Sequence, residues 1–158
     1  MTVATALKSL LENKIFLSTI ISMCGAQALK LVFYLIINKK NKKKWDAIET
    51  VLWRTGGMPS SHSALVCALA TSVGIYEGIA STYFVLSLVF AMVVLRDSMG
   101  VRRAAGLPAR ALNSLGKQSA ENSGIEFHSV KEIQGHTPLE VLIGAFFGIL
   151  IAVIFYLI

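Results

Sequence analysis

Three short strings contain residue types that could carry out phosphate-ester hydrolysis. Gly-Gly-Met-Pro-Ser-Ser-His at 56–62 and Gly-His-Thr-Pro-Leu-Glu at 135–140 each place one histidine at the start of an apolar segment of helical length. Two imidazoles can divide such a reaction, because one can attack while the other protonates the leaving group. Between them, Arg-Asp-Ser-Met-Gly-Val-Arg-Arg at 96–103 supplies guanidinium groups for a phosphate. Together the strings indicate a phosphatase.

The first string has the features of a helix start that could bind an anion. Gly56 and Gly57 permit close backbone approach, and Ser60 or Ser61 can cap a helix. The first turn of a helix offers N–H groups and a positive dipole end to a phosphate, and His62 would project from that turn. The alternative is a plain helix-start signal with an interfacial histidine, and this string alone does not decide between the two.

The second string suits a histidine nucleophile. His136 and Glu140 are four residues apart, so they can share one helical face. A carboxylate that accepts the proton of one imidazole nitrogen leaves the other nitrogen basic and stabilises the imidazolium that forms. Taken alone, the string reads more simply as a helix cap with an incidental pair. A second histidine, His62, on the same membrane face favours catalysis.

Several charged residues could hold the phosphoryl oxygens. Arg54, Arg102 and Arg103 can each form bidentate hydrogen bonds to phosphate, although arginines at helix ends also anchor membrane proteins. Asp97 could orient one of these arginines or cap the following segment. Lys30 lies within an apolar segment, where a cation must either reach the headgroups or face a polar site. It is therefore a further candidate for phosphate binding.

Composition places the chain in a membrane. The 158 residues, treated as a single domain at 1–158, are 54% hydrophobic and only 15% charged, and the mean hydropathy is +0.64. The net charge of +6 includes a dense lysine run at 39–44. No nucleic-acid motif accompanies this run, so we expect no nucleic-acid partner. Retention of basic loops in the cytoplasm explains the run better.

The apolar segments predict an all-α integral membrane bundle. Four segments can span a bilayer, at 15–37, 62–77, 80–96 and 139–158, and the spacing of apolar residues over 2–12 predicts an N-terminal interfacial helix. The basic loops then face the cytoplasm, and the C-terminus lies outside. This multi-pass arrangement in the inner (cytoplasmic) membrane brings all three strings to the cytoplasmic face.

The second hydrophilic loop, 97–138, is predicted to contain helical structure at 104–115. Its Ser-, Gly- and Asn-containing stretch at 116–124 is predicted to be mobile. Whether 116–134 closes over the site as a lid or only links two helices stays open at this point.

The three strings resemble a known family. Gly-Gly-Met-Pro-Ser-Ser-His-Ser-Ala, Asp-x-x-Gly-Val-Arg-Arg-Ala-Ala-Gly and Gly-His-Thr-Pro-Leu-Glu-Val are similar to motifs of a small divergent bacterial and plastid branch of the type 2 phosphatidic acid phosphatase superfamily. That superfamily also contains the vanadium-dependent haloperoxidases. The resemblance extends from Lys30 to the C-terminus. It implies a metal-independent membrane phosphatase without a cofactor.

The resemblance also implies roles for individual residues. His136 would attack phosphorus and form a phosphohistidine, with Glu140 in place of the family's usual aspartate. His62 would protonate the leaving alkoxide, while Ser60, Ser61 and basic residues hold the phosphoryl oxygens.

The chain also departs from the family pattern. The usual first motif, a lysine followed by Arg-Pro, is absent, and the Ser-Arg expected before the last histidine is Ser129-Val130. The string at 96–102 looks like a displaced copy of that arginine-bearing half. The chain has fewer spans than the usual six-helix members, so a homodimer could complete the core.

The expected site favours a membrane lipid as substrate. A cytoplasmic site at headgroup depth fits phosphatidylglycerophosphate, which would be hydrolysed to phosphatidylglycerol. Phosphatidic acid and an isoprenyl diphosphate such as undecaprenyl diphosphate are alternatives. A non-catalytic lipid-binding membrane protein also remains open at this stage.

Overall fold

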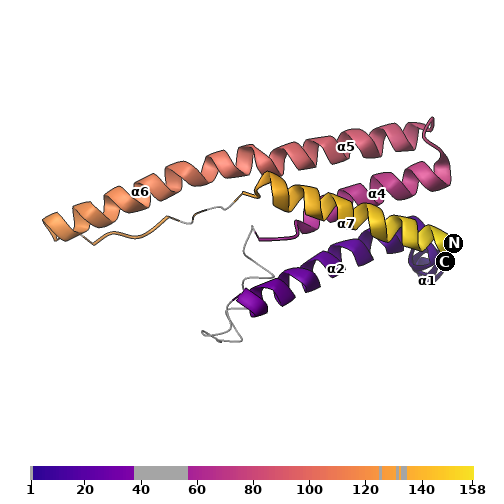
Figure 1. Cartoon of the computed structure of the whole chain (residues 1–158), viewed down its shortest axis with the longest axis horizontal. Helices are drawn as coiled ribbons and strands as arrows, with labels where there is room; N and C mark the ends of the chain where they lie inside the picture. Colours follow the sequence, from indigo (N-terminus) through magenta and orange to yellow (C-terminus); the bar gives the residue numbers. More distant parts are fainter. Residues whose placement is uncertain (1, 38–56, 125, 131, 133–134) are drawn as a thin grey trace.

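The described part of the chain is helical and contains no strand, as the sequence predicts. The computed structural model describes residues 2–37, 57–124, 126–130, 132 and 135–158, with the backbone alone at 37, 101–103 and 105. The lysine run and Arg54 therefore lie outside the described residues. The helices, shown in Figure 1, are α1 (Val3–Glu12), α2 (Lys14–Ile37), α4 (Ser61–Glu77), α5 (Thr82–Met99), α6 (Val101–Ser123) and α7 (Pro138–Leu157).

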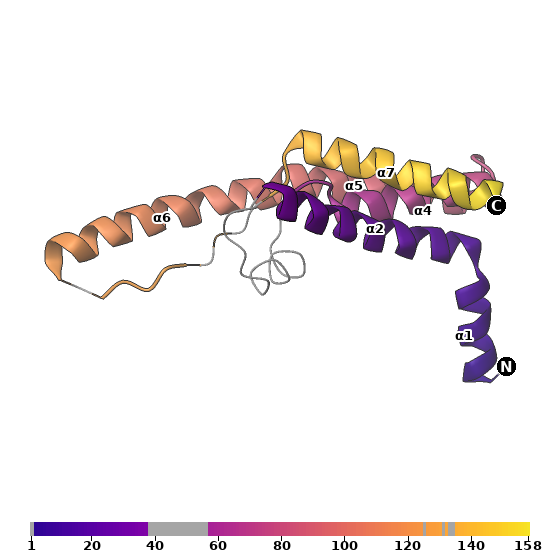
Figure 2. The same ribbon diagram turned by 60° about the horizontal axis from the view of Figure 1, so that its bottom comes forward.

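Four helices form a bundle with α4 at its centre. Helix α4 packs against α2, α5 and α7, and α2 also packs against α7. Figures 1 and 2 show both termini at one end of this bundle. The starts of α4 and α7 and the ends of α2 and α5 meet at the opposite end. The bundle thus gathers the predicted site strings at one end.

Among the described residues, three helices are long and apolar enough to cross a membrane: Lys14–Ile36, Thr82–Met99 and Pro138–Leu157. Helix α4 has 17 residues, or about 25 Å at 1.5 Å per residue. It is interior to the bundle, with Ala64 and Ala68 fully buried. The arrangement is compatible with the four predicted spans, whose bounds agree with the observed helices to within three residues.

Small residues bring α7 and α4 into close contact. A Cβ atom on Gly144 would collide with the backbone of Ser60, and one on Gly148 would collide with the backbone of Ala64. This Gly-x-x-x-Gly spacing places both glycines on one face of α7 and is typical of helix packing in membranes. The contact holds the first turns of α4 and α7 beside each other.

Buried serines connect α2 to α4. The Ser18 and Ser72 hydroxyls are 2.7 Å apart, and the Ser22 hydroxyl donates to the Ala64 carbonyl over 3.1 Å. All three serines are fully buried. Hydrogen bonds between helices stabilise their association in an apolar medium, where packing supplies little hydrophobic driving force.

The predicted N-terminal helix is present as α1. Thr2 caps it by accepting from the Thr5 amide, and no residue of α1 is buried. Its apolar residues Val3, Leu7 and Leu11 are exposed, and Figure 2 shows α1 at an angle to the bundle. Its location on the membrane surface stays a prediction.

The loop between α5 and α7 corrects one expectation. The stretch at 116–123, predicted to be mobile, belongs to α6, which continues in line with α5 beyond the bundle (Figures 1 and 2). The helix ends at Gly124, whose φ of 67° is left-handed and costs glycine little. The polar composition of the stretch indicated a loop, but its side chains instead form the exposed end of a helix.

Candidate active site

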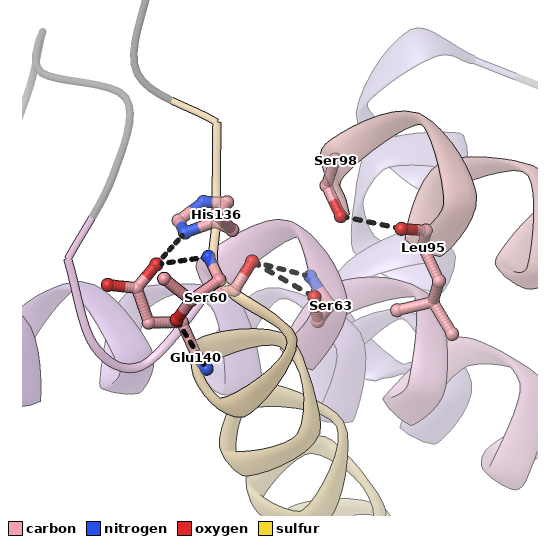
Figure 3. Close-up of polar contacts among 7 residues, drawn as sticks. Ser60, Ser63, Leu95, Ser98, His136 and Glu140 are labelled. Carbon is pink, nitrogen blue, oxygen red and sulfur yellow. Dashed lines mark hydrogen bonds and ion pairs between the residues drawn. The ribbon is translucent and has the colours of Figure 1, made fainter. Parts of the chain in front are cut away.

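Glu140 holds His136 at the start of α7. The Glu140 carboxylate oxygen Oε2 lies 3.1 Å from His136 Nδ1 and accepts from the Thr137 amide over 2.9 Å. In return, the Thr137 hydroxyl accepts from the Glu140 amide, which completes a capping box with Pro138 in the first turn. Figure 3 shows the imidazole and the carboxylate facing each other. The local sequence Thr-Pro-Leu-Glu therefore both starts the helix and orients the histidine.

His136 is also fixed from α5. Its backbone amide donates to the Ser98 carbonyl over 3.1 Å, and the residue is only 7% exposed. An imidazole that donates its Nδ1 proton to a carboxylate keeps Nε2 as the basic nitrogen. Contacts with two helices, α5 and α7, thus fix the position of His136.

The first turn of α4 lies beside this pair. The Ser60 amide donates to the Glu140 carbonyl over 3.1 Å, which joins the two strings through their backbones. The Ser60 hydroxyl is the N-cap and accepts from the Ser63 amide and hydroxyl (Figure 3). Ser60 is fully buried, so its role in the described structure is to cap α4. Its contact with phosphate stays a prediction.

His62 and Ser61 occupy the first turn of α4. The His62 residue is exposed, whereas Ser61 is 8% exposed. The amides of a first turn have no partners within their own helix, so this end of α4 can attract an anion. The structure therefore brings both predicted histidines to one end of the bundle, each in or beside the first turn of a helix.

Lys30 reaches both strings from α2. It is 9% exposed, and a Cβ atom on Gly57 would lie 2.9 Å from its Cε. Its ammonium also interacts electrostatically with Glu140. The left-handed φ of 88° at Gly57 favours a glycine there. Lys30 thus lies at the candidate site.

The remaining predicted residues are less completely described. Asp97 is half-buried in the last turn of α5, next to Ser98. Arg102 and Arg103 lie in the first turn of α6, which places their backbones at the same end of the bundle as the histidines. Among the described residues, no group of three or more His, Cys, Asp or Glu side chains could hold a metal ion.

Sequence reasoning missed two contributors to the site. Ser98 acts through its carbonyl, which any residue would provide, so its side chain carried no signal. Gly144 sets the distance between α4 and α7, and its Gly-x-x-x-Gly spacing with Gly148 could have revealed it.

Side chains of α6 bind the segment that precedes His136 through a set of contacts that we call the clasp, formed by Asn113, Arg110, Val130 and Glu132. The Asn113 side chain donates to the Val130 carbonyl and accepts from the Val130 amide, both over 2.8 Å. Its Nδ2 also donates to Glu132 over 2.9 Å, and Arg110 pairs with the same carboxylate over 3.2 Å. Asn113 is buried at 7% exposure, so it supports the segment that precedes the string at 135–140.

Replacing Asn113 with alanine is expected to release Val130. The variant loses both hydrogen bonds to the Val130 backbone, so amide exchange at Val130 should accelerate by about tenfold or more. Hydrogen–deuterium exchange of the full-length protein measures this effect. Asn122→Ala, an exposed change in the same helix, should leave Val130 protected. Unchanged protection in Asn113→Ala would contradict the clasp.

Comparison with known proteins shows the family of the chain. The apolar helices define an integral membrane protein. Residues 11–151 match the Divergent PAP2 family. The uncharacterized membrane protein YuiD of Bacillus subtilis is 35% identical, over 92% of this chain and 95% of its own length. No solved structure matches the chain. The chain belongs to the Divergent PAP2 family, as its three strings indicate.

Proposed function

We propose that this protein is a membrane lipid phosphatase that works through a phosphohistidine at His136. The observation that carries the proposal is the Glu140–His136 pair, joined by the Ser60 amide to the helix start that bears His62. A nucleophile, a group that orients it and a second imidazole on one end of a bundle form the minimum set for this chemistry.

In the first step, Nε2 of His136 attacks phosphorus and the bond from phosphorus to the ester oxygen breaks. His62, in its protonated form, gives its proton to the departing alkoxide, which leaves as an alcohol. Glu140 stabilises the positive charge on the imidazole of His136. Water then attacks the phosphohistidine, His62 takes a proton from it, and inorganic phosphate departs as His136 is restored.

Positive charge should stabilise the phosphoryl oxygens during both steps. We assign this role to Lys30, to the first-turn amides of α4 at Ser61 and His62, and to arginines of the segments flanking the bundle. Arg54, Arg102 and Arg103 are the arginines proposed for it. Asp97 is proposed to orient one of them.

The proposed substrate is phosphatidylglycerophosphate, which would be converted to phosphatidylglycerol. The starts of α4 and α7 lie at the same end of the bundle as the ends of α2 and α5. In the sequence, the hydrophilic segments that follow α2 and α5 are rich in Lys and Arg, and such segments stay in the cytoplasm. We therefore propose a location in the inner (cytoplasmic) membrane with the site on the cytoplasmic side. A lipid phosphate made on the inner leaflet would then reach the site at headgroup depth.

The substrate proposal is tested by measuring phosphate release from detergent-solubilised protein with a chelator present. Phosphatidylglycerophosphate, phosphatidic acid and an isoprenyl diphosphate are offered at equal surface concentration. We expect metal-independent release, fastest from phosphatidylglycerophosphate. Faster release from another lipid would make that lipid the substrate in place of phosphatidylglycerophosphate. Release from none of them would favour a non-catalytic lipid-binding protein and overturn the proposal.

Replacing Lys30 with methionine is expected to slow phosphate release by about 10- to 100-fold. This range corresponds to the loss of one charge-assisted hydrogen bond of roughly 1.5–3 kcal/mol. Methionine keeps an unbranched stem beside Gly57, so packing should persist. Lys14→Met, an exposed change in the same helix, serves as the matched control. Equal rates of phosphate release for wild type and Lys30→Met would show that Lys30 does not stabilise the phosphoryl oxygens.

A further inference from the structure

Helix α6 carries an apolar stripe that the described part of the chain leaves exposed. Leu107, Leu112 and Leu115 are 62%, 51% and 65% exposed, and Ala104 and Ala111 are exposed as well. We call these five residues the α6 stripe. At 100° per residue they fall on one side of the helix, so they form a continuous surface.

The opposite side of α6 is already covered. Asn113 and Arg110 bond to Val130 and Glu132 of the returning segment, and the Phe127 ring lies against Gly116. The segment that contains Phe127, Val130 and Glu132 therefore supplies hydrogen-bond partners to the polar side of α6, and the stripe faces away from this segment.

The direction of α6 places the stripe outside the bilayer. Figures 1 and 2 show α6 extending in line with α5, past the ends of α2 and α4. If α5 spans the membrane, α6 projects from it into water, where exposed leucines are unfavourable. A second helix, rather than lipid, is the partner that this direction favours.

The spacing of the stripe suits pairing with an identical helix. With Pro108, which is exposed on the same side of α6, three stripe residues recur at intervals of four, three and four residues, as in a two-helix seam: Ala104, Pro108, Ala111 and Leu115. Two copies in one membrane point the same way, so each residue would meet its own counterpart. Lys117 lies on the other side of the helix, so its charge would not oppose pairing.

The exposed face of α5 continues this pattern. Leu86, Phe90 and Val93 are 62%, 52% and 61% exposed and recur at intervals of four and three residues. The same partner could therefore contact both helices.

We propose that the α6 stripe is an interface with a second copy of this chain, formed by parallel α6 helices. This inference goes beyond the proposed phosphatase activity and does not depend on it. It assigns a surface to the homodimer that the small number of spans led us to expect.

Disulfide cross-linking in native membranes tests the interface. With Cys24 and Cys67 first replaced by alanine, Leu115→Cys should form a cross-linked dimer under mild oxidation, because its counterpart lies across the seam. Lys117→Cys, two residues away on the other side of α6, is the matched control and should remain largely monomeric. Equal cross-linking of both variants, or of neither, would overturn the proposal.

A charged residue in the stripe provides a second test. Ala111→Glu should convert the dimer to a monomer, because two carboxylates would meet in the seam. Lys117→Glu should leave the dimer intact. The mass of each purified variant is measured by light scattering with the detergent contribution subtracted. A monomeric wild-type protein would contradict the proposal. If the thiol of the Leu115→Cys variant also reacts with a lipid-soluble probe, the stripe faces the bilayer instead.

Discussion

His136→Ala is expected to lower the rate of phosphate release by at least about 10⁴-fold, because it removes the atom that bonds to phosphorus. The fold should persist, since Glu140 keeps its bond to the Thr137 amide and the His136 backbone keeps its bond to the Ser98 carbonyl. Phosphate release from purified protein measures the effect.

The third histidine provides the matched control for this variant. His128 has an 88% exposed side chain, with Nε2 3.9 Å from Glu126 Oε1, and has no role in the proposed site, so His128→Ala should retain wild-type activity. Glu140→Gln should release phosphate about 10²- to 10³-fold more slowly than wild type, a rate between those of His136→Ala and His128→Ala. This variant keeps the nucleophile but removes the charge that stabilises the imidazolium. Full activity in His136→Ala would disprove the proposed nucleophile.

Gly144→Leu is expected to abolish both the stable bundle and activity. Even a Cβ atom at this position collides with the backbone of Ser60, and backbone cannot move aside as a flexible side chain can. A leucine would force α7 away from α4 and separate the Glu140–His136 pair from the helix start of His62. We expect a loss of at least about 2 kcal/mol in stability, visible as a lower unfolding temperature in detergent.

A graded series sharpens this prediction. Gly144→Ala should already lower the unfolding temperature, although by less than the leucine variant. Phe146→Ala, on the same helix but 69% exposed, should change it little. Equal unfolding temperatures for Gly144→Leu and Phe146→Ala would contradict the close contact between α7 and α4.

Much of the fold could be predicted because local signals were strong. Long apolar segments predicted the spans, and the helix starts at Ser60 and Thr137 follow from their capping residues. The spacing of His136 and Glu140 predicted their contact, but His136 precedes the N-cap Thr137, so the pair meets through the capping box and not along one helical face.

Other features depended on contacts between distant segments. The sequence left two interpretations of Lys30 open, and it did not report that the Lys30 stem lies against Gly57, 27 residues later in the sequence. The stretch at 116–123 was predicted as a loop from its composition. In the structure, α6 carries the Asn113 clasp and continues through this stretch as a helix. Such contacts follow from tertiary packing, which local composition does not report.

Detecting the covalent intermediate tests the central claim most directly. An aryl phosphate has a good leaving group that needs little protonation, so His62→Ala should still be phosphorylated and should release phosphate slowly. Rapid quenching at alkaline pH, followed by peptide mass spectrometry, locates the phosphoryl group. The proposal predicts phosphate on His136 that is lost in acid and absent from His136→Ala. Turnover of the aryl phosphate with no phosphate on any histidine would contradict the mechanism.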